Sequence, residues 1–101
     1  MEVQVESGRA AGMRFRNAIE ARLRFALRRL SWLVPQATVR LSDLKRDAGS
    51  PDKCCEVRLK VVGTRDVVVS AIARDWLQSI DDALKGAARR LERQYRRTYA
   101  A

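Results

Sequence analysis

The spacing of apolar residues changes along this chain from two residues to about 3.6 and back, and this order restricts the fold more than any other feature. Residues 2–6 alternate, residues 13–33 follow a helical period, residues 37–72 alternate again, and residues 76–98 return to the helical period. Alternation places side chains on the two faces of a strand, whereas steps of three and four place them on one face of a helix. The sequence therefore predicts the element order β-α-β-β-β-α.

The last predicted helix, residues 76–98, is amphipathic. Its apolar residues form one stripe that should face the core: Trp76, Ile80, Ala83, Leu84, Ala87, Leu91 and Tyr95. The opposite side carries Lys85, Arg89, Arg93, Arg96 and Arg97. A helix of this design packs against a core on one side and presents positive charge on the other.

Three further residues of this helix carry predictions. Asp75 should cap the first turn, with Gln78 as the reciprocal partner in a capping box. Gly86 lies in the helix interior, where glycine costs about 1 kcal/mol relative to alanine. The helical wheel puts Gly86 on the arginine side. It is there either as a tolerated glycine or because a phosphate or a partner approaches the backbone.

The first predicted helix, residues 13–33, repeats the amphipathic design. Its apolar stripe consists of Phe15, Ile19, Leu23, Ala26, Leu27, Leu30 and Leu33, and its basic residues are Arg14, Arg22, Arg24, Arg28 and Arg29. Pro35 should end the helix, and Gly12 is only a fair candidate for its N-cap. Two helices with basic faces indicate one shared basic surface.

The alternating segments predict a single sheet. The connection from strand 2–6 to the strand starting at Ala37 passes through a helix, so this pair should be parallel. The later strands are joined by a long loop at 43–53 and a tight turn at 63–66, so they should be antiparallel. We expect an α+β fold in one domain, residues 1–101, with a four-stranded mixed sheet and two helices packed on one face. The other face should expose Thr38, Arg40, Ser42, Arg58 and Lys60.

The charge of the chain favours a phosphate-rich partner. It has 21 basic residues, only four of them lysine, against 12 acidic ones, for a net charge of +9. The planar guanidinium group binds phosphate with two parallel donors, so RNA or DNA backbone is the expected ligand. The alternating segments carry no exposed aromatic residue, which argues against stacking of bases on the sheet. Two plainer explanations stand beside this one: a GC-rich genome, and charge that only keeps the protein dissolved.

Other classes of function find little support in the sequence. It has no histidine, no glycine-rich phosphate loop and no nucleophile elbow, so we expect no enzyme, no metal site and no cofactor. Asp81 and Asp82 lie early in a helix, where negative charge offsets the helix dipole. Cys54 and Cys55 are adjacent and should point to opposite faces as free thiols. Without a signal peptide or a membrane span, the expected location is cytoplasmic and no membrane partner is expected.

Several segments together resemble the ribosome hibernation-promoting factor and ribosome-associated inhibitor family over nearly the whole chain. They are ATVRLSD, DKCCEVRLKVVG, VVVSA, the D-W-x-x-x-I-D pattern at 75–81 and LERQYRR at 91–97. The resemblance implies a double-stranded-RNA-binding-like fold. It also implies a protein that binds the small ribosomal subunit where messenger and transfer RNA would sit, contacts ribosomal RNA through basic residues and holds ribosomes idle under stress.

By position, the resemblance implies RNA-binding roles as phosphate clamps for eleven residues: Arg22, Arg28, Arg29, Lys45, Arg46, Lys53, Arg89, Arg90, Arg93, Arg96 and Arg97. The chain departs from the family pattern in a last helix about one turn longer, a poor match at 7–13, and an end at Ala101 without a second, dimerising domain. We therefore expect a short, divergent form. The alternative is a protein-interaction module of the same fold that forms a homodimer through its open sheet or an edge strand.

Overall fold

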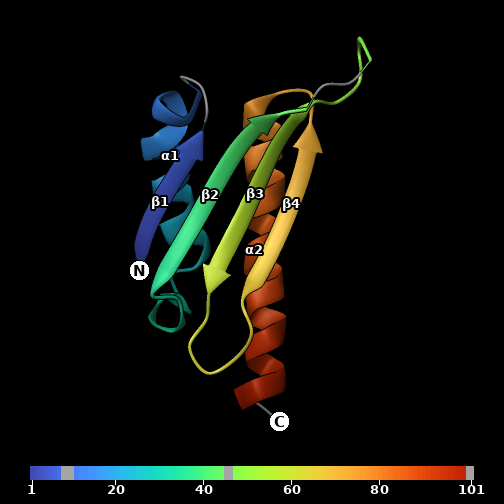
Figure 1. The fold of residues 1–101 in the computed structure, drawn as a ribbon. Coiled ribbons are helices and arrows are strands. Elements are labelled where there is room, and N and C mark those ends of the chain that lie inside the picture. The colour runs from blue at the N-terminus through green and yellow to red at the C-terminus, as the bar shows by residue number, and fades with distance from the viewer. Residues whose placement is uncertain (8–10, 45–46, 100–101) are drawn as a thin grey trace.

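The computed structural model describes residues 1–7, 11–44 and 47–99, and it confirms the predicted order of elements and the α+β class. One mixed sheet is covered on one face by two helices (Figure 1). The strands are β1 (Glu2–Ser7), β2 (Gln36–Asp43), β3 (Lys53–Lys60) and β4 (Val67–Ala73), and the helices are α1 (Ala11–Ala26) and α2 (Trp76–Tyr99).

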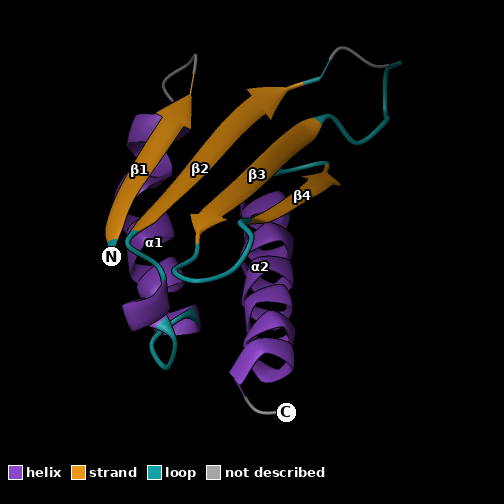
Figure 2. Ribbon diagram, turned by 60° about the horizontal axis from the view of Figure 1, so that its bottom comes forward, coloured by secondary structure: helices purple, strands orange, loops and turns teal. Residues whose placement is uncertain are grey.

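The strands lie side by side in chain order. β1 pairs with β2 in parallel, and the other two pairs are antiparallel, as predicted. Figure 2 shows both helices on the same side of the sheet. In Figure 1, α1 lies behind β1 and β2, and α2 lies behind β3 and β4. In Figure 1 the last turns of α2 extend beyond the strands. No helix in the described ranges is long and apolar enough to cross a membrane.

The core lies between the helices and the inner face of the sheet. Both predicted helical stripes point into it, and Ile19, Leu23 and Ile80 are at most 1% exposed. The strands contribute alternate residues, including Val57 and Leu59 of β3. Ser79 is also fully buried, and its hydroxyl donates to the Trp76 carbonyl at 3.1 Å, so no polar atom is left without a partner there.

The prediction that the first helix continues to Leu33 and ends at Pro35 is wrong. The α-helix ends at Ala26, a turn follows, and residues 31–33 form a 3₁₀ segment, η1 (Ser31–Leu33). Backbone bonds close over three residues here: the Leu30 amide donates to the Leu27 carbonyl and the Leu33 amide to the Leu30 carbonyl, both at 2.9 Å. A spacing of three fits the three residues per turn of a 3₁₀ helix, so all three leucines still face the core.

The helix starts were predicted only in part. α1 begins at Ala11, so Gly12 lies inside it rather than at the cap. Asp75 caps α2 as expected, because its Oδ1 accepts from the Gln78 amide at 2.9 Å. The capping box is not formed, since the Gln78 side chain donates to Oδ1 of Asp82 at 2.8 Å. Residues four apart are neighbours on a helix surface, and this contact replaces the reach back to Asp75.

Gly86 faces the sheet, so its predicted place on the arginine side is also wrong. A Cβ atom built on it would lie 2.9 Å from Cγ1 of Val69 in β4. Real Cβ atoms do not approach so closely, and the β-branched Val69 side chain has little freedom to move aside. The glycine therefore allows α2 to lie close against β4.

The outer face of the sheet is polar and balanced in charge over β1, β2 and β3. Thr38 is partly exposed, and Arg40, Ser42, Arg58 and Lys60 are exposed, as predicted. Arg40 lies between Glu6 of β1 and Glu56 of β3 in the sheet register, and it pairs with Glu6 at 3.1 Å. The cysteines are free thiols on opposite faces, Cys54 partly exposed and Cys55 buried. Burial raises the pKa of the Cys55 thiol to about 12, so it stays protonated near neutral pH.

Replacing Gly86 by alanine should destabilise the fold by about 1 kcal/mol, because overpacking against Val69 outweighs the gain of about 1 kcal/mol in helix propensity. Urea unfolding of the two proteins measures this difference. The matched control is the same change in a Val69→Ala background, which removes Cγ1. There Gly86→Ala should stabilise the protein by about 0.5–1 kcal/mol. Stabilisation in both backgrounds would show that the close contact does not restrict this position.

Candidate nucleic-acid interface

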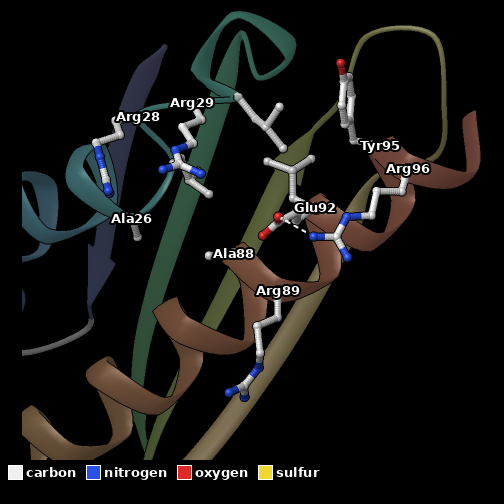
Figure 3. Close-up of a pocket in the computed structure, with 11 residues that line it drawn as sticks. Ala26, Arg28, Arg29, Ala88, Arg89, Glu92, Tyr95 and Arg96 are labelled. Carbon is white, nitrogen blue, oxygen red and sulfur yellow. Dashed lines mark hydrogen bonds and ion pairs between the residues drawn. The ribbon is translucent and has the colours of Figure 1, made fainter. Parts of the chain in front are cut away.

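A groove of about 510 Å³ runs between the end of α1 with its following turn and the second half of α2. Its apolar residues are Ala26, Leu27, Leu30, Ala88 and Leu91, and its polar and aromatic residues are Arg28, Arg29, Arg89, Glu92, Tyr95 and Arg96. Figure 3 shows Arg28 and Arg29 on one side of this groove and Arg89 and Arg96 on the other. The turn after α1 and helix α2, far apart in sequence, thus bring four predicted site residues together.

The four arginines of this helical groove differ in what holds them. Arg28 lies 4.2 Å from the centre of the exposed Phe25 ring and donates to the Phe25 carbonyl at 2.9 Å. Arg96 pairs with Glu92 one turn earlier at 2.8 Å. Arg29 and Arg89 have no ion pair with any described carboxylate. Two guanidinium groups are therefore held in place and two can turn towards a ligand.

A second arginine cluster lies on the other flank of α2, beside the turn between β3 and β4. A cavity of about 390 Å³ is lined there by Thr64, Arg65, Arg90, Arg93, Gln94, Arg97 and Thr98. The Gln94 side chain donates to the Arg65 carbonyl at 2.5 Å, and Arg90 donates to the Val68 carbonyl at 3.4 Å. These bonds fasten the helix to the turn. No acidic residue is among the described residues that line this turn-side cavity.

Electrostatics makes both surfaces suited to an anion. Like charges placed close together repel one another, and this repulsion is relieved when a negative ligand lies between them. Guanidinium groups bind phosphate oxygens through paired, charge-assisted hydrogen bonds. A ligand that carries several phosphates can engage the helical groove and the turn-side cavity at once, since both flank the same stretch of α2.

The remaining predicted site residues lie elsewhere. Arg22 pairs with Asp81 of α2 at 2.7 Å, which joins the two helices near the start of α2. Lys53 lies 2.5 Å from Asp43 and 3.6 Å from Asp52, with its ammonium group 5.5 Å from the centre of the Trp76 ring. The hydrogen bond to Asp43 raises the pKa of Lys53 above its ordinary value. Lys45 and Arg46 lie outside the described residues.

Several residues of these surfaces were not predicted as site residues, among them Arg65 and Trp32. Arg65 lines the turn-side cavity, and Trp32 lies beside the helical groove with 65% of its surface exposed. The topology does contain a signal for Arg65. A short connection joins β4 to α2, so the helix must run back along the strand and bring its second half to the β3–β4 turn. The position of Trp32 depends on the 3₁₀ segment, which the helical periodicity concealed.

Comparisons with known proteins match this chain to a family and to solved structures. The family model described as sigma 54 modulation protein / S30EA ribosomal protein matches residues 8–98. A ribosomal subunit interface protein from Coxiella burnetii superposes with a TM-score of 0.70 at 16% identity, with 100% of both chains covered. The N-terminal domain of Protein Y from Thermus thermophilus has a TM-score of 0.61 at 24% identity, with 96% of this chain and 98% of that chain covered. No curated protein sequence matches significantly.

Removing the carboxylate from the helical groove should strengthen binding of polyanions. Glu92→Gln frees Arg96 and deletes one negative charge, and we expect affinity to rise about two- to fivefold, the range of an exposed ion pair. Elution from a heparin column at higher salt measures the change. Glu20→Gln is the control, because it makes the same charge change at the Arg24 pair of α1, outside the groove residues. Equal shifts for both variants would show that only net charge matters.

Proposed function

Since the chain belongs to the sigma 54 modulation protein / S30EA ribosomal protein family, we propose that it binds the small ribosomal subunit and holds ribosomes idle. The match covers most of the chain and confirms the family expected from the sequence. The two solved structures of the same fold are described as a ribosomal subunit interface protein and as part of Protein Y. Family membership thus supports the ribosome as the partner.

The observation that supports RNA contact is the division of the α2 arginines between two flanks of one helix. Arg89 and Arg96 line the helical groove, while Arg90, Arg93 and Arg97 line the turn-side cavity. Ribosomal RNA offers phosphate backbones that approach one another closely, and a helix with arginines on both flanks can contact two of them. Contacts of this kind supply affinity and orientation without reading a base sequence.

The proposed mechanism is exclusion of other ligands from the bound position. α2 and the turn after α1 hold their arginines on a rigid frame, because the apolar residues of both segments are buried in the core. Little conformational entropy is lost when such a surface binds, so most of the free energy of the phosphate contacts contributes to affinity. A factor bound where messenger and transfer RNA would sit blocks translation by occupancy alone, and this role requires no catalytic group.

Reversal of charge in the turn-side cavity should abolish ribosome binding. We expect Arg93→Glu with Arg97→Glu to leave the fold intact, because both side chains are exposed, and to remove the protein from small-subunit fractions of a sucrose gradient. For the unmodified protein, neutralising about six phosphates gives a slope of log affinity against log salt of about −4 to −5.

The control for this variant makes the same change in net charge on the open sheet, with Arg58→Glu and Lys60→Glu. It should bind ribosomes nearly as well as the unmodified protein. Failure of the unmodified protein to sediment with ribosomes at low salt would refute the proposal. If both double variants lost ribosome binding equally, the result would show that only the total charge of the protein matters.

A second candidate function is self-association through the sheet, and one observation favours it. Val68 and Ile72 of the edge strand β4 are 37% and 42% exposed on the outer face. An unpaired strand edge with apolar side chains can pair with another copy. The Arg58 and Lys60 variant tests this candidate as well. If self-association is the function, light scattering should show that this variant has a different oligomeric state from the unmodified protein. Ribosome binding should then not depend on Arg93 and Arg97.

A further inference from the structure

Three aromatic side chains gather where η1 meets the end of α2. The Trp32 and Tyr95 rings are 6.2 Å apart and perpendicular, and the Tyr95 and Tyr99 rings are 5.3 Å apart. Trp32 is 65% exposed and Tyr99 48% exposed. This aromatic row lies at the helix ends and not on the sheet. The absence of exposed aromatic residues from the strands argues only against base stacking on the sheet, so stacking on this row is still possible.

The row is held in place although it is exposed. The indole Nε1 of Trp32 donates to the Arg29 carbonyl at 3.2 Å, and the next residue, Leu33, is fully inside the core. The Tyr99 hydroxyl donates to the Val62 carbonyl at 3.3 Å, which fixes the other end of the row. A large apolar ring that is fixed in orientation and left in water is a typical feature of a binding site, because binding then costs little ordering.

Phosphate-binding groups adjoin this row. Tyr95 lines the helical groove together with Arg29 and Arg96, and Figure 3 shows Arg96 beside Tyr95 at one end of it. Arg29 joins the two features, since its carbonyl orients Trp32 while its side chain lines the groove. A ligand that fits both must carry negative charge next to flat apolar rings. A single-stranded nucleic acid has this chemistry, whereas a duplex hides the faces of its bases.

We propose that Trp32, with Tyr95 and Tyr99, forms a stacking site for an unpaired base of single-stranded RNA whose neighbouring phosphates lie on Arg29 and Arg96. This inference rests on the proposed ribosome binding and narrows it, because the RNA must be single-stranded at this point. The arginines alone would accept any arrangement of phosphates. The aromatic row adds a requirement for exposed bases, and base–aromatic stacking is tolerant of sequence.

Tryptophan fluorescence tests the site directly. The chain has two tryptophans, and Trp76→Phe leaves Trp32 as the only one. The probes are a single-stranded RNA oligonucleotide, a duplex of the same length and inorganic polyphosphate. Stacking predicts that the single strand quenches Trp32 and that polyphosphate, which has no bases, binds without quenching. Equal quenching by polyphosphate would overturn the proposal.

Affinity measurements on the chain with Trp76 in place give a second test. Trp32→Ala should weaken binding of a labelled single strand about five- to 150-fold and leave polyphosphate binding unchanged. Trp32→Phe keeps a ring and should restore most of the affinity. Because Trp32 is exposed, the unfolding midpoint should not change, which separates lost stacking from lost fold. Unchanged single-strand affinity in Trp32→Ala would refute the stacking site while leaving ribosome co-sedimentation, and the Arg93 and Arg97 result, unaffected.

Discussion

Helix α2 buries Ile80, Leu84 and Leu91 in the core beneath β3 and β4, and the positions of the α2 arginines follow from this packing. Each such side chain contributes about 1.5–3 kcal/mol when removed from water, so the stripe fixes both the rotation and the lateral position of the helix. Gly86 determines how near the helix lies to β4, because a Cβ atom would meet Val69. Once the rotation of α2 is fixed, the face of the helix on which each of its arginines lies is fixed as well.

Both arginine surfaces are consequences of this fixed rotation. The helix continues beyond the strands, so its second half is open on two flanks (Figure 1). One flank meets the turn after α1, which adds Arg28 and Arg29, and the other meets the β3–β4 turn, which adds Arg65. The result is a single helix with a cationic recess on either side. The positions of these positive charges therefore depend on how the core packs, and the charges are not scattered at random over the surface.

Much of this architecture could be predicted from periodicity alone, because a buried stripe and an alternating strand are local patterns. The errors have physical causes. Leu27, Leu30 and Leu33 fit both a 3.6-residue and a three-residue period, so the change from α to 3₁₀ geometry was hidden. Gly86 was misplaced because a wheel drawn from sequence does not include β4. Trp32 and Arg65 were missed because their neighbours come from segments distant in the chain, and only the tertiary packing brings those segments together.

The balanced outer face of the sheet has a consequence of its own. Three carboxylates, of Glu2, Glu6 and Glu56, offset the three positive charges of Arg40, Arg58 and Lys60 there. The helix side carries Arg89 and Arg93, which form no ion pair with a described carboxylate. The molecule therefore has an electric dipole across its thickness, with the positive end on the helix side. The electric field of a polyanion rotates such a molecule so that its helix side faces the polyanion before contact. Association is therefore faster than it would be for randomly oriented encounters. This gain in association rate fades as added salt shortens the range of the field.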